Sequence, residues 1–164
     1  MHNPSKAWRN EYICVVKTQI EFIYQTDFEL SDENAYAEWL GRCASLYDTK
    51  SLILAFAFMD DASLCDLNIK HLNHDTLTDI ITFDDSVGLD IEANIAISIE
   101  RVKANAKEYA QLFENELLRV MSHGLLHCLG LGDKTENEAK AMRLAEEQCI
   151  KLFHVEQKPQ NNAW

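Results

Sequence analysis

Hydrophobic residues recur along this chain with two different spacings, and the spacing changes several times between its two ends. Alternating or unbroken runs of apolar and β-branched residues are typical of strands, and they predict strands at 20–24, 51–59, 78–83 and 94–99. Apolar residues three and four positions apart predict helices at 32–46, 61–71, 101–109 and 112–129, and a last helix after residue 135. This irregular mixture indicates an α+β (mixed α/β) fold, with helices packed on a single sheet.

Some of these segments carry more specific signals. Ser31 is the predicted N-cap of the helix at 32–46, because its hydroxyl can accept a hydrogen bond from the first helical turn. The unbroken apolar run at 51–59 predicts a strand buried on both faces. Thr135 and Glu138 have the spacing of a capping box, which predicts where the last helix begins. That helix has one apolar face, formed by Met142, Ala145, Cys149 and Phe153.

The segment 112–129 is apolar on nearly every side, which predicts a helix buried within the domain. Its polar residues are nevertheless gathered on one stripe. At about 100° per residue, the stripe fits within an arc of roughly 80°, and it consists of Glu116, Arg119, His123 and His127. A buried helix with a single polar stripe indicates a functional site on that stripe.

The two histidines on this stripe have the spacing of metal ligands. His123 and His127 are four residues apart, so a helix places both imidazoles on one side. Asp133 follows six residues later, after the helix-breaking Gly130. Two helical histidines and a third ligand returned by a turn are how a catalytic zinc is held, with one position open for water. This donor set also suits nickel or cobalt, and the competing interpretation is a pair of hydrogen-bonded core histidines.

One expected residue of a zinc protease is missing. The H-E-x-x-H motif places the general base directly after the first histidine, and here that position is Gly124. Glycine can supply no base, so the metal-ligand spacing is retained while the protease interpretation loses its support.

The segment from His123 to Gly130 resembles the H-G-x-L-H-L-x-G signature of the YbeY family of metal-dependent endoribonucleases. A second block, Leu67-Asn68 followed by 78–83, resembles that family's L-N…T-D-V-L-S-F segment, and the similarity spans roughly residues 20 to 155. The resemblance implies a four-stranded sheet with about five helices, with the histidine helix central. It also implies a role in rRNA maturation and ribosome quality control, with hydrolysis of single-stranded RNA by a zinc-bound water.

The sequence departs from the family pattern at three places. Asp133 stands where the family usually has a third histidine, which adds a negative charge to the predicted site. Leu72 replaces an arginine, and the loss of one such charge-stabilising group typically costs about 10²–10³ in rate. The usual G-D before the I-S strand is Ala93-Asn94. Metal binding is therefore better supported than catalytic power.

The formal net charge of −12 at pH 7 is unusual for a protein that binds RNA phosphates. A local basic groove could offset it, or a ribosomal protein or the small subunit could deliver the RNA. Two alternatives therefore remain beside the endoribonuclease. One is a ribosome-associated assembly factor with a structural metal, and the other is a metallohydrolase of another substrate.

The remaining predictions concern the limits of the domain and secondary site residues. We expect an N-terminal extension at 1–18, one hydrolase-like domain at 19–156 and a polar tail at 157–164. Five cysteines without a C-x-x-C pair, and the lack of a signal core or membrane span, predict free thiols in a cytoplasmic protein. The secondary candidates are Glu116 and Arg119 for catalysis, and Thr78, Asp79 and Lys134 for RNA binding. Glu116 could also orient a metal ligand, and Arg119, like Lys134, is a candidate phosphate contact.

Overall fold

The computed structural model describes residues 17–73 and 78–157. In chain order, the elements are β1 (Lys17–Tyr24), α1 (Glu33–Ser45), β2 (Ser51–Met59), α2 (Asp61–Leu72), β3 (Ile80–Asp84), β4 (Asp90–Ser98), α3 (Ile99–Glu108), α4 (Phe113–Cys128) and α5 (Glu136–Gln157). The predicted extension and tail lie almost wholly outside the described residues, so the proposed domain limits stay a prediction.

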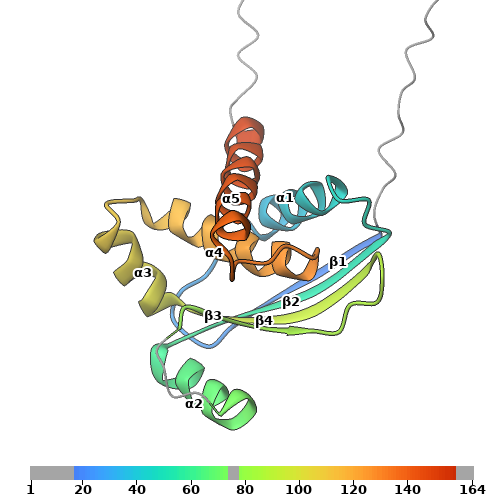
Figure 1. Cartoon of the computed structure of the whole chain (residues 1–164). Helices are drawn as coiled ribbons and strands as arrows, with labels where there is room; N and C mark the ends of the chain where they lie inside the picture. Colours follow the sequence, from blue (N-terminus) through green and yellow to red (C-terminus); the bar gives the residue numbers. More distant parts are fainter. Residues whose placement is uncertain (1–16, 74–77, 158–164) are drawn as a thin grey trace, which may run out of the picture.

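The strands form one mixed sheet in the order β1-β2-β4-β3. β1, β2 and β4 run parallel, and β3 pairs with β4 in the antiparallel direction. Helices α1, α4 and α5 cover one face of this sheet, and α2 lies on the opposite face (Figure 1). The predicted α+β fold with one four-stranded sheet and five helices is confirmed for the described part of the chain.

The main core lies between the sheet and α1, α4 and α5. β2 contributes alternate residues to this core, because successive side chains of a strand point to opposite faces, and these are Leu52, Leu54, Phe56 and Phe58. The opposite face of β2 is only partly covered, since α2 packs on β3, β4 and the end of β2. Ile53 is 38% exposed there. The prediction that β2 is buried on both faces was therefore wrong.

Helix and strand ends also depart from the predicted ones. β4 begins at Asp90, four residues before the predicted 94, because its whole length pairs with β2 from Ser51 onward. Ile99 belongs to α3, since the Ser98 side chain accepts a hydrogen bond from the Arg101 amide and so begins the helix. None of the helices in the described ranges is long and apolar enough to cross a bilayer.

The N-cap of α1 is Asp32, not the predicted Ser31. The Asp32 side chain accepts a hydrogen bond from the Ala35 amide at 3.1 Å. We expect Asp32→Ala to lower the free energy of unfolding by about 1 kcal/mol, because the Ala35 amide would lose its hydrogen-bond acceptor. Ser31→Ala is the matched control and should change it by less than about 0.5 kcal/mol. Urea denaturation measures both, and equal effects would contradict the assignment.

Candidate metal centre

The two histidines of α4 face each other across one helical turn. His123 Nε2 and His127 Nε2 are 2.9 Å apart. The side chains are 19% and 32% exposed, although the helix around them is almost wholly buried. α4 packs against β3, β4 and α5, so its polar stripe meets the surface at the two imidazoles and at Arg119, whose side chain is 32% exposed.

The chain after α4 turns back and brings a carboxylate to the same point. Gly130 has φ +100°, a backbone conformation that residues with a Cβ rarely adopt. Asp133 Oδ2 then lies 3.2 Å from His127 Nε2 and 3.4 Å from His123 Nε2. The three predicted ligand residues therefore come together, and their ligand atoms all lie within 4.8 Å of one another.

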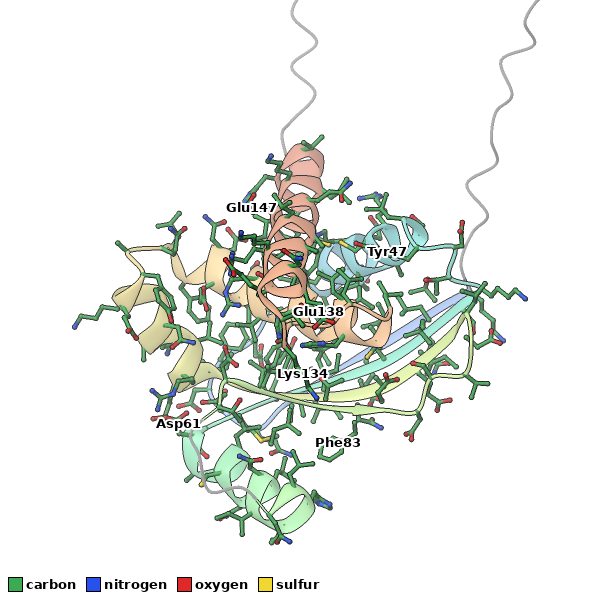
Figure 2. The ribbon with its side chains drawn as sticks, viewed as in Figure 1. Tyr47, Asp61, Phe83, Lys134, Glu138 and Glu147 are labelled. Atoms are coloured by element: carbon green, nitrogen blue, oxygen red, sulfur yellow. The ribbon has the colours of Figure 1, made fainter. Side chains whose placement is uncertain are left out.

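The capping box at the start of α5 fixes this turn. Thr135 and Glu138 exchange the predicted hydrogen bonds, Glu138 N to Thr135 Oγ1 and Thr135 N to Glu138 Oε2. The Lys134 amide also donates to Glu138 Oε2, and Figure 2 shows Lys134 and Glu138 together at the foot of α5. A Cβ on Gly132 would lie 2.8 Å from that oxygen, so glycine allows the turn to pass close to the cap.

The other ring nitrogens indicate which tautomer each imidazole adopts. His127 Nδ1 lies 2.9 Å from the carbonyl oxygen of Leu131, which can only accept, so Nδ1 carries the proton. His123 Nδ1 lies 2.7 Å from Glu146 Oε1, and an ionised carboxylate likewise only accepts. In neutral rings both Nε2 atoms then present lone pairs to each other and to Asp133. Three such electron-rich atoms favour a cation between them.

The spacing of these atoms fits a first-row divalent metal. Zinc bonds to nitrogen and oxygen of about 2.0–2.2 Å place two tetrahedral ligand atoms about 3.3 Å apart. The three pairs of donor atoms are separated by 2.9, 3.2 and 3.4 Å. His123, His127 and Asp133 could therefore hold a metal ion, as the ligand types also allow.

Gly124, at the position of the general base in zinc proteases, lies close to the side chains of the sheet. A Cβ at this position would lie 2.8 Å from Ile80 Cδ1 and 3.4 Å from Ile95 Cδ1. Glycine thus lets α4 approach β3 and β4 closely. A larger residue would have to displace the ends of these isoleucine side chains, so glycine suits the close packing at this position.

A cavity of about 420 Å³ opens beside the imidazoles. Residues of β3 and the segment before it form its other wall, and these are Thr78, Asp79, Ile80, Thr82 and Asp84. Two of the predicted RNA-binding residues, Thr78 and Asp79, therefore lie next to the histidines. Lys134, the third, is exposed and is not among the residues that line this cavity.

Arg119 joins several parts of the fold through its guanidinium group. It binds Glu116 through Nη2 at 2.6 Å and Nε at 3.0 Å, and its Nη2 lies 3.4 Å from Asp79 Oδ2. Burial alone would lower the pKa of Arg119, but the hydrogen bond with Glu116 and the nearby carboxylates outweigh it and raise the pKa. Glu116 is 2% exposed and pairs with this arginine, so it contacts neither histidine directly.

Glu146 on α5 is the site residue that sequence analysis missed. Its carboxylate contacts His123, and only 5% of the residue is exposed. A signal was present in the sequence, because Glu146 lies four residues after Met142 and three before Cys149, both on the apolar face of α5. A carboxylate on the buried face of a helix indicates a specific partner.

The cysteines described in the structure are free thiols, as predicted. Cys43, Cys128 and Cys149 are buried and Cys65 is half-buried, while Cys14 lies outside the described residues. Burial raises the pKa of the Cys128 thiol to about 12. Cys128 therefore packs in the core as a neutral group and is not a member of the metal-ligand cluster.

The fold and the site define a class of protein with a candidate metal centre on a buried helix beside an open cavity. Comparison with known proteins agrees with this class. The family model described as Endoribonuclease YbeY matches residues 20–154. The Endoribonuclease YbeY of Flavobacterium johnsoniae is 44% identical over 138 residues, which cover 84% of this chain and 99% of that protein. The Endoribonuclease YbeY of Karelsulcia muelleri is 37% identical, with 85% and 97% covered.

The chain therefore belongs to the YbeY family. Among solved structures, the solution structure of a Thermotoga maritima protein superposes with a TM-score of 0.64. That structure is 21% identical and covers 89% of this chain and 100% of its own. At this level of identity it supports the fold.

The close packing at Gly124 can be tested by adding one methyl group. Alanine is about 1 kcal/mol better than glycine in a helix interior, so Gly41→Ala in α1, where a Cβ would lie 3.4 Å from Thr18, should raise stability by up to about 1 kcal/mol. At Gly124 overpacking costs about 1–3 kcal/mol. We therefore expect Gly124→Ala to lower stability by up to about 2 kcal/mol in urea denaturation. An equal gain at both positions would refute the packing argument.

Proposed function

We propose that this protein is a metal-dependent endoribonuclease that acts in rRNA maturation and ribosome quality control. The observation that carries the proposal is the convergence of His123 Nε2, His127 Nε2 and Asp133 Oδ2 on one point beside an open cavity. Membership of the YbeY family supplies the reaction and its RNA substrate. Zinc is the proposed metal, and nickel or cobalt suits the same ligands.

The residues of the site have distinct proposed roles. His123, His127 and Asp133 hold the ion, which when bound acidifies a water molecule and polarises a phosphoryl oxygen. The β3 wall of the cavity, with Thr78 and Asp79, lies where a single-stranded RNA would pass the ion. The exposed Lys134, next to Asp133 in sequence, is the proposed phosphate contact.

Charge is the main constraint on RNA binding. The cavity is lined by Asp79 and Asp84, Asp133 lies beside it, and the chain carries a formal net charge of −12. These carboxylates repel phosphates unless a bound cation offsets them. Ribosomal proteins or the small subunit are the proposed partners that bring RNA to such a surface.

The second candidate function is an assembly factor with a structural metal. Leu72, at the family's arginine position, is 47% exposed at the end of α2 and offers no charge to a phosphate, which favours this alternative. The donor set favours the enzyme, because a structural zinc site usually has four protein ligands. In the described part of the chain the cluster has three, with a cavity beside it. Cleavage of single-stranded RNA by the metal-loaded protein, lost on chelation and restored by zinc, distinguishes the two.

Metal content tests the ligand assignment directly. We expect the wild-type protein to bind one zinc per chain. His127→Ala and Asp133→Ala should each lose most of this metal, because each removes one of three ligands. His154→Ala is the control, since its Nε2 contacts Asn115 Oδ1 and belongs to no metal-ligand cluster. Inductively coupled plasma mass spectrometry after dialysis measures the bound zinc. Unchanged content in both ligand variants would remove these residues from the proposed site.

The proposed phosphate contact predicts a change in salt dependence. Each phosphate contact to single-stranded RNA contributes about 0.7 to the slope of log affinity against log salt. We expect Lys134→Ala to weaken binding of a single-stranded oligoribonucleotide and to reduce the slope by about that amount. Lys140→Ala is the matched control, because the exposed Lys140 side chain on α5 already pairs with Glu136. Fluorescence anisotropy between 50 and about 200 mM salt compares them, and equal slopes for the two variants would argue against a contact at Lys134.

A further inference from the structure

Glu146 is a buried carboxylate on a helix face that is otherwise apolar. Its side chain is 6% exposed, and its neighbours on that face include Met142, Ala145 and Cys149. Burying a charge is costly unless the group is paired and hydrogen-bonded. We therefore expect Glu146 to have a hydrogen-bonded partner that offsets the free-energy cost of burying its charge.

Arg119 is not sufficient as that partner. Its Nη1 lies 3.8 Å from Glu146 Oε1, which is too long for a hydrogen bond. The same guanidinium group already binds Glu116 at 2.6 Å and 3.0 Å and has Asp79 at 3.4 Å. An uncharged residue in place of Glu146 would leave Arg119 paired. The short contact of Glu146 is the one to His123 Nδ1, at 2.7 Å.

The contact between Glu146 and His123 Nδ1 also affects His123 Nε2, the ring nitrogen that faces Asp133. A neutral imidazole carries one proton, and a proton on Nδ1 leaves the lone pair on Nε2. For His127, the carbonyl oxygen of Leu131 fixes this tautomer from the loop that follows α4. His123 lies one turn earlier on α4, and its contact comes from α5 instead. Without Glu146, its Nδ1 would lose that acceptor and Nε2 could carry the proton.

We propose that Glu146 is a positioning residue of the metal centre, which holds His123 in the tautomer and orientation that direct Nε2 toward the ion. Arg119 supports it as the nearest cation, and ties α5 to Glu116 of α4 and Asp79 before β3. The inference rests on the proposed metal site and adds a residue 23 positions away from His123 in the sequence.

The experiment compares Glu146→Met with Glu116→Met. Both changes keep a similar side-chain length and remove one carboxylate beside Arg119 together with its acceptor oxygens, but only Glu146 contacts a histidine. Zinc affinity is measured by competition with a chromophoric chelator, and urea denaturation reports stability. Loss of such a partner typically costs 10–100-fold in metal affinity. We expect that loss for Glu146→Met, and less than about a threefold change for Glu116→Met, whatever their effects on stability.

NMR of the wild-type protein tests the tautomer of His123 without relying on any variant. In the metal-free wild-type protein with ¹⁵N-labelled histidine, at a pH where NMR shows the His123 ring to be neutral, its proton should lie on Nδ1 and Nε2 should be bare. A neutral His123 ring with its proton on Nε2, equal losses of zinc affinity in the two methionine variants, or wild-type affinity in Glu146→Met would each overturn the inference. Wild-type protein that binds no zinc would instead overturn the proposed metal site, and the inference with it.

Discussion

The structure depends on one constraint, the burial of α4 on nearly every side while it presents two imidazoles at a surface. The sheet, α3 and α5 all pack on this helix, and its apolar residues form the centre of the core. Glycine at position 124 allows a close approach to the sheet, because a Cβ there would meet the side chains of Ile80 and Ile95. A rigid helix between two layers keeps the histidines in fixed rotamers, and a metal centre needs that preorganisation. The packing that stabilises the domain thus also positions its site.

The centre combines local and long-range structure, and this division explains how much the sequence could predict. His123, His127 and Asp133 span eleven positions, and helix periodicity, a glycine turn and a capping box determine how they meet. Patterns of that kind are visible in a sequence. Glu146 and the β3 wall reach the histidines only through the packing of α5 and the sheet, so no local spacing predicts their contacts. Thr78 and Asp79 could be named only through the family resemblance.

The fold shows the same division between local pattern and tertiary context. β2 was predicted with both ends correct, because its apolar run has polar residues on each side. Its exposed face could not be predicted, since that depends on where α2 packs. The start of β4 is set by pairing with β2. Ser31 and Asp32 are both good N-cap residues, and the choice between them depends on the path of the chain into α1, where Asp32 has extended backbone angles.

The aspartate at the third ligand position changes the electrostatics of the whole site. Two neutral imidazoles and one carboxylate would leave a divalent ion with a net charge of +1, whereas a third histidine would leave one more positive charge. A more negative ligand set holds a cation more firmly and attracts a phosphate less. The acidic cavity wall acts in the same direction. Under the proposed function, such a site favours retention of a metal over electrostatic capture of RNA, and recruitment of the substrate would come from contacts outside the centre. On that proposal, an acidic chain with this site is better suited to RNA already held in a larger assembly than to free RNA.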